Sequence, residues 1–153
     1  MPDVLGFTEV PAAEPSLDHT LVEISRTRRL QRDQIVATHD SVTVPMVAKA
    51  HGTSEEAARQ WLYRHRNAGR LVSVDHGRLV LVPSFQLDAD TQPRPDVAPL
   101  VTRMVEAGMS GWSVWTWWVT DNGWLERAPI DALDAGDETG VAEAVDRLLD
   151  PVA

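Results

Sequence analysis

The chain has 153 residues, a hydrophobic fraction of 43% and a formal net charge of -9, which suits one medium or two small globular domains. It contains no cysteine, so a disulfide framework, a thiolate zinc site and a cysteine nucleophile are excluded. The first residues lack a basic segment followed by an apolar run, and no eighteen apolar residues are consecutive. We therefore expect no secretory signal and no membrane-spanning helix, but a cytoplasmic protein.

The charge is unevenly distributed along the chain. Residues 17–87 carry ten Arg and Lys against seven Asp and Glu, whereas residues 88–153 carry four against thirteen. A mildly basic segment can meet phosphates, and a strongly acidic one is better suited to a basic protein surface. The two parts are therefore expected to bind different kinds of partner.

The N-terminal region predicts a tail followed by a helix. Residues 1–16 are rich in proline and have no amphipathic period, which is typical of a disordered tail. Leu17, Leu21 and Ile24 then recur at i, i+4 and i+7, so a helix is expected from Leu17. The basic stretch RTRRLQR follows, and a loop is expected around THDSVT, residues 38–43.

The next segment predicts two helices joined by a tight turn. A short helix would end at Gly52, and TSEE, residues 53–56, has a capping-box pattern. In that pattern Thr53 would cap a second helix and the Glu56 carboxylate would reach back to the backbone of Thr53. This helix would run to about Asn67, with Gly69 just past its end.

The spacing of Ala48, Gly52 and Ala58 resembles the helix-turn-helix of bacterial DNA-binding proteins. Small residues allow two helices to cross closely, and glycine allows the turn between them. On the second helix a core-facing stripe is expected at i, i+3, i+4 and i+7, formed by Ala58, Trp61, Leu62 and His65. The opposite face is polar, and a merely solvated face is the alternative to a DNA-reading one.

The segment GRLVSVDHGRLVLVP, residues 69–83, predicts a β-hairpin that would serve as a wing. Its turn falls at DHG, where Gly77 can supply a positive φ. Gln and Arg can read base edges, and basic residues of a wing can contact the DNA backbone. The candidate DNA-binding residues are Thr53, Ser54, Glu56, Arg59, Gln60, Tyr63, Arg64, Arg70, His76 and Arg78.

Three prolines within residues 88–99 predict an extended linker. The expected fold is therefore mainly α. After the tail of residues 1–16, a winged helix-turn-helix domain of three helices and a hairpin would span residues 17–87. A small all-helical domain would follow the linker over residues 100–153.

Five tryptophans fall within residues 111–125. A helix from about Ser110 to Thr120 would carry apolar residues around most of its circumference, so it should be buried on several sides. We expect at least two tryptophans to belong to the core. The surplus is expected at a protein interface, where tryptophan is enriched among the residues that carry binding energy.

A family resemblance covers residues 83–149. The segments PSFQLD, AGMSGW, WWVTDNGWL, APIDAL and DAGDETGVAEAV follow one another, and their order and spacing resemble the toxin-binding domain of the Xre/MbcA/ParS-type antitoxins. Two features depart from the family pattern. The turn WLERAP is one residue shorter and lacks the usual glycine, and Ala128 stands where a Ser or Thr would cap the helix beginning at Pro129.

The resemblance implies an antitoxin that binds and neutralises an NAD-consuming RES-domain toxin and represses its own promoter as a homodimer. It implies no cofactor. Helix formation is expected over about residues 139–149, with the chain end lying against the toxin. The residues assigned to the toxin or dimer interface are Trp112, Trp115, Trp117, Trp118, Trp124, Arg147, Asp150 and Ala153.

Other functions are weighed against this one. The histidines lack metal-ligand spacing, and neither a phosphate-binding glycine loop nor a nucleophile elbow occurs, so we expect no metal site and no enzyme. A stand-alone dimeric winged helix-turn-helix transcriptional regulator without a toxin partner is the alternative. An adaptor that has lost DNA binding also stays open.

Overall fold

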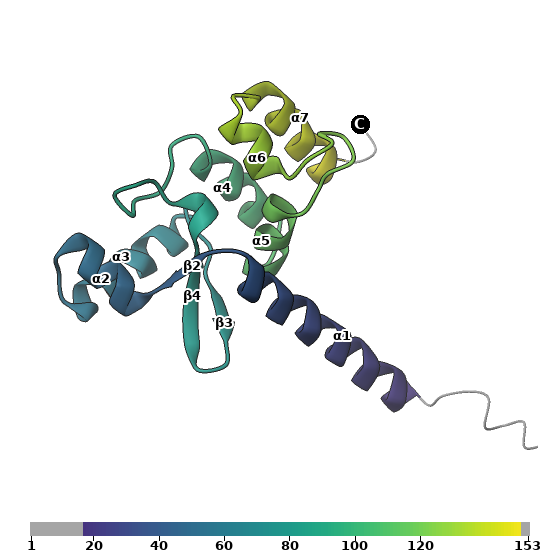
Figure 1. The fold of residues 1–153 in the computed structure, drawn as a ribbon, viewed down its shortest axis with the longest axis horizontal. Coiled ribbons are helices and arrows are strands. Elements are labelled where there is room, and N and C mark those ends of the chain that lie inside the picture. The colour runs from purple at the N-terminus through teal and green to yellow at the C-terminus, as the bar shows by residue number, and fades with distance from the viewer. Residues whose placement is uncertain (1–16, 151–153) are drawn as a thin grey trace, which may run out of the picture. The chain divides into compact units, whose positions relative to one another are not determined.

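The computed structural model describes residues 17–150 (Figure 1). The tail predicted for residues 1–16 lies outside the described residues, as does Ala153. The described chain is mainly helical with a small three-stranded antiparallel sheet, which is compatible with a winged-helix fold. It divides into two units, of which the first ends at Ile35 and the second begins at Val36.

Helix α1 (Leu17–Thr38) begins where the apolar spacing predicted. Its 22 residues include none that is buried. The predicted winged domain of residues 17–87 therefore differs from the structure, because most of α1 belongs to a unit of its own. A sequence pattern shows that a segment is helical, but not which core, if any, the helix joins.

The second unit starts with the winged part. Its elements are β2 (Ser41–Thr43), α2 (Val44–His51), α3 (Glu55–Asn67), β3 (Val74–His76), β4 (Leu79–Pro83) and the short 3-10 helix η3 (Ser84–Gln86). The strand order is β2-β4-β3, with Val42 opposite Val82 and Asp75 opposite Val80. The expected loop at residues 38–43 is thus partly a strand, because β4 offers it a free edge. The predicted hairpin is confirmed, and Gly77 at its turn has φ 62°.

The turn between α2 and α3 has the predicted glycine but not the predicted cap. Gly52 ends α2 with φ 67°, and the backbone N–H of Thr53 donates to the carbonyl of Ala48 at 2.9 Å. That N–H is therefore not available to Glu56, so the capping box is wrong. Ser54 caps α3 instead, its hydroxyl accepting from the N–H of Ala57 at 3.1 Å.

Two hydrophobic cores fill the second unit. The core of the winged part contains the predicted crossing residues Ala48 and Ala58, together with Val47, Trp61, Leu62, Leu71 and Val82. The other core is built by α4 (Ala98–Glu106), α5 (Gly111–Val119), α6 (Pro129–Asp134) and α7 (Glu138–Leu149). Within it, Val114 and Trp118 of α5 lie in one cluster with Val141 and Val145 of α7. The helices expected from Ser110, at Pro129 and near residues 139–149 are confirmed.

The segment between α3 and β3 passes from one core to the other. Leu71 belongs to the core of the winged part, and its neighbour Val72 belongs to the helical core. The buried side chain of Gln86 closes a pair of hydrogen bonds with Val72, accepting from its N–H at 2.9 Å and donating to its carbonyl at 2.7 Å. Gly111 lies so close that a Cβ there would be 2.5 Å from the carbonyl oxygen of Ser73.

The prolines of residues 88–99 do not form the predicted extended linker. The loop folds back on itself, with the N–H of Asp88 donating to the carbonyl of Gln92 at 2.8 Å and Thr91 at φ 57° in the turn. Arg94 then ties the loop to α6, because its guanidinium contacts Asp96 at 2.9 Å and Asp134 at 2.9 Å. Proline ends helices, but side-chain contacts distant in sequence decide whether the chain between them is ordered.

The substitution Gln86→Leu is expected to lower the free energy of unfolding by about 2–4 kcal/mol, because it leaves the buried N–H and carbonyl of Val72 unpaired. Urea denaturation measures this. The exposed Gln60→Leu serves as the matched control and should change stability by less than about 0.5 kcal/mol. Equal effects of the two substitutions would mean that water replaces the Gln86 amide.

Candidate functional site

The exposed face of α3 is the candidate nucleic-acid interface. Its predicted inward stripe is confirmed, since Ala58, Trp61 and Leu62 are buried and His65 is half-buried. The predicted outward residues Glu56, Arg59, Gln60, Tyr63 and Arg64 are all exposed. The last four together line one shallow pocket. Burial of one face against α2 thus leaves the opposite face free for a partner.

Side-chain contacts order part of this face. The Arg59 guanidinium lies 3.5 Å from the Glu55 carboxylate and 3.7 Å from that of Glu56. The Gln60 amide donates to Glu56 at 3.4 Å. All of these groups are exposed, so the contacts are weak and exchange readily with a stronger partner. Thr53 and Ser54 lie exposed at the N-terminal end of the helix.

The residues predicted for the wing are only partly available. Arg78 is exposed beside Gly77 at the tip of the hairpin. Arg70 is also exposed, and its Nε donates to Nδ1 of His65 at 2.9 Å. His76 is half-buried, with its ring 6.2 Å from that of Trp112. The structure therefore leaves Arg70 and Arg78 as the better candidates for backbone contacts.

Sequence reasoning missed a network that fixes α3 on its inner side. The Trp61 indole donates to Gln92 at 3.1 Å. The same ring meets His51 and His65 edge-on, at centroid distances of 4.9 and 5.0 Å. His51 Nε2 lies 2.8 Å from the carbonyl oxygen of Thr91. The folded loop of residues 88–99 thus supports the candidate recognition helix, and neither histidine has a sequence signal that would have shown this.

The tryptophans of the helical part have separate roles. Trp115 and Trp118 are fully buried, which confirms that at least two belong to the core and excludes these two from a surface contact in this conformation. Trp112 is half-buried and stacks on Trp115 at 5.6 Å, and Trp117 is half-buried against Trp118 at 5.2 Å. The interface assignment of Trp115 and Trp118 is wrong for this conformation, because helical spacing does not say how many sides of a helix are covered, whereas that of Trp112 and Trp117 stays a prediction.

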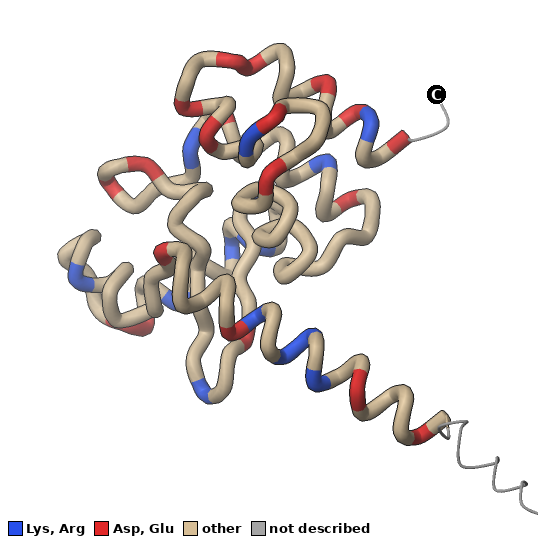
Figure 2. Tube along the Cα trace, turned by 45° about the vertical axis from the view of Figure 1, so that its right-hand side comes forward, with Lys and Arg blue, Asp and Glu red and all other residues tan. Residues whose placement is uncertain are grey.

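Trp124 is the tryptophan that the structure presents at the surface. It is 51% exposed, and the Arg147 guanidinium carbon lies 3.6 Å from the centre of its ring. The turn is held by Asn122, whose side-chain oxygen accepts from the N–H of Trp124 at 2.8 Å. Asp150, at the end of α7, shares a shallow charged pocket with Arg147, Arg103, Glu143 and Asp146. Trp124, Arg147 and Asp150 therefore define a second candidate surface. It lies on the helical part of the chain, which carries more acidic residues than the winged part (Figure 2).

His65 generates a prediction about pH. Burial lowers its pKa below 6.5, and repulsion from Arg70 lowers it further. The neutral ring therefore persists in the folded chain, whereas the unfolded chain binds the proton near pH 6.5. The neutral His65 ring therefore makes its full contribution to the free energy of unfolding above pH 6.5. That contribution is lost as the pH falls below 6.5. NMR titration of the His65 ring should give a pKa below 6.5, and Arg70→Ala should raise it. A pKa at or above 6.5 would contradict the arrangement.

Comparison with known proteins adds information about the fold. No protein-family model matches the chain, and no curated protein matches it. The fold is similar to that of Rv2175c, solved by NMR, with a TM-score of 0.58 and 19% sequence identity over 76% of this chain and 83% of that one. No helix in the described part of the chain is long and apolar enough to cross a membrane. At 19% identity the likeness extends to the fold, and the antitoxin resemblance stays a prediction.

Proposed function

We propose that the protein binds double-stranded DNA, with α3 in the major groove and the β3–β4 hairpin against the neighbouring backbone. The observation that carries this proposal is the exposed face of α3, where Arg59, Gln60 and Arg64 surround Tyr63. Arginine can donate two hydrogen bonds to guanine, and glutamine can pair with adenine in the same way. The helix is wide enough to fill that groove, and its opposite side is fixed to the core.

The charges around this face fit a protein that recognises particular bases better than one that binds DNA only through its charged backbone. Glu55 and Glu56 lie in the first turn of α3, where they repel phosphates and hold Arg59. A binder that uses phosphate contacts alone would gain by losing both acids. Arg70 and Arg78 supply positive charge for the DNA backbone from the wing. Both the antitoxin and the stand-alone regulator include this activity.

Arg59→Ala or Gln60→Ala should each weaken binding to the DNA upstream of the protein's own gene by about 1–3 kcal/mol. Fluorescence anisotropy measures this, and affinity should fall steeply as salt rises. The matched control Arg127→Ala removes the same charge from the acidic part and should leave affinity unchanged. If the double variant Arg59→Ala/Gln60→Ala binds as tightly as the parent, α3 is not the recognition helix.

The second candidate function is toxin neutralisation by the helical part, and the exposed Trp124 favours it. Tryptophan and arginine are the residues most often found to carry binding energy at interfaces. Here the two are stacked on each other at the surface of an acidic region. Together with the resemblance to the antitoxins, this supports a RES-domain toxin as the partner. In a stand-alone dimeric regulator the same surface would instead join two copies of the chain.

Trp124→Ala should weaken binding to the RES-domain protein encoded beside this chain by about 2 kcal/mol or more. Calorimetric titration of the purified pair measures this. Tyr63→Ala, which removes an exposed aromatic residue from α3, is the control and should leave that affinity unchanged. Absence of any complex between the parent proteins would exclude neutralisation, without bearing on DNA binding.

A further inference from the structure

Helix α1 carries an apolar stripe whose first three members are exposed and whose last member, Ile35, is half-buried. Leu17 is 74% exposed, Leu21 53% and Ile24 43%. If Leu17 is placed at position d of a heptad, Leu21, Ile24 and Ile35 occupy a and d positions along the same seam. Arg28 and Gln31 complete the seam as its polar members. The stripe thus has the pattern of a short coiled-coil contact.

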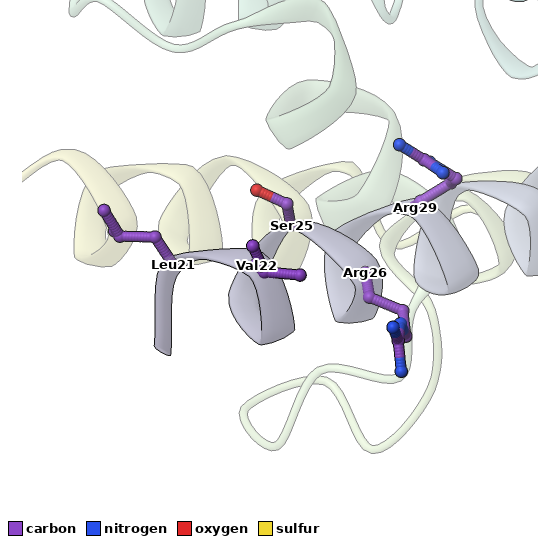
Figure 3. Close-up of a pocket in the computed structure, with 5 residues that line it drawn as sticks. All are labelled: Leu21, Val22, Ser25, Arg26 and Arg29. Atoms are coloured by element: carbon purple, nitrogen blue, oxygen red, sulfur yellow. The ribbon is translucent and has the colours of Figure 1, made fainter. Parts of the chain in front are cut away.

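A shallow groove runs beside this seam. Leu21, Val22, Ser25, Arg26 and Arg29 line it. Figure 3 shows that Leu21, Ser25 and Arg29 follow one another along the same side of α1. In the heptad, Ser25 occupies an e position, as do Asp18 and Arg32. In a coiled coil the e positions flank the seam, where charged side chains set the orientation of the partner.

Charge is segregated along the helix. Asp18 and Glu23 outnumber Arg26 in its first half, and Arg28, Arg29 and Arg32 outnumber Asp33 in its second half. Two copies of α1 in antiparallel orientation bring the acidic half of each against the basic half of the other. Asp18 then faces Arg32 of the second copy, and symmetry repeats this pair. The same register places Leu17 opposite Ile35 and Ile24 opposite Arg28, whose aliphatic stem can cover it.

A parallel pairing fits the residues less well. It would set Arg28 opposite Arg28 and Gln31 opposite Gln31 at the centre of the seam, and would bring the basic halves together. Like charges at such positions destabilise the pair. We propose that α1 is a self-association surface whose partner is α1 of a second copy of this chain, in antiparallel orientation. The seam is shorter than three heptads, so the dimer should dissociate on dilution.

Introduced cysteines test the orientation, because the chain contains none. Leu17 and Ile35 lie about 27 Å apart along one helix, so a disulfide between them must join two chains. The full-length double variant Leu17→Cys/Ile35→Cys should form a disulfide-linked dimer under mild oxidation. Neither single variant should do so. Cross-linking of Leu17→Cys alone would show a parallel dimer and overturn the proposal.

A charge exchange tests the pairing itself. Sedimentation velocity of the full-length parent should show a monomer–dimer equilibrium. Asp18→Arg or Arg32→Asp should weaken it about tenfold, because two attractive contacts become repulsive. The double exchange Asp18→Arg/Arg32→Asp should restore it to within about threefold.

Asp33→Arg, on the outer side of α1, and Arg127→Asp, in the second unit, make the same charge changes outside the seam and are the matched controls, which should leave the equilibrium unchanged. A parent that stays monomeric at high concentration overturns the proposal, as does a double exchange that does not restore association. Circular dichroism shows whether each variant keeps its helix.

Discussion

The paired hydrogen bonds between Gln86 and Val72 are the contact on which the second unit depends. Val72 lies where the chain leaves one hydrophobic core and enters the other, so its backbone groups are buried without a strand to pair them. An unpaired amide or carbonyl there would cost more than a surface hydrogen bond is worth. The amide of Gln86 supplies both a donor and an acceptor, and so permits two cores to share one segment.

This arrangement makes the candidate recognition helix part of a larger compact unit. Loop 88–99 contacts α3 through Gln92 and α6 through Arg94. The close approach of Gly111 to Ser73 fixes α5 beside the segment that enters the wing. Residues that would read DNA and residues that would meet a protein therefore belong to one compact unit from Val36 onward.

Much of the candidate DNA interface was predictable, since it depends on local physics. Helical periodicity separates Ala58, Trp61 and Leu62 from the polar face that contains Arg59 and Gln60, whatever the rest of the chain does. Glycine at the turns has a conformational reason that is visible in sequence. The network around Trp61 was not predictable. It joins residues about thirty to forty positions apart, and neither His51 nor Gln92 has a distinctive spacing.

The sequence by itself determined most of the helices, though not α4, together with the wing hairpin and the inward and outward faces of α3, because each of these follows from short-range periodicity and turn chemistry. Only the tertiary structure decided the rest. It ordered the proline-rich loop through Arg94 and Gln92, and it placed most of α1 in a unit of its own. It also buried Trp115 and Trp118 while leaving Trp124 exposed. Burial depends on which surfaces meet in the folded chain. Tryptophans that are close in sequence can therefore be either buried or exposed, according to the elements that pack against them.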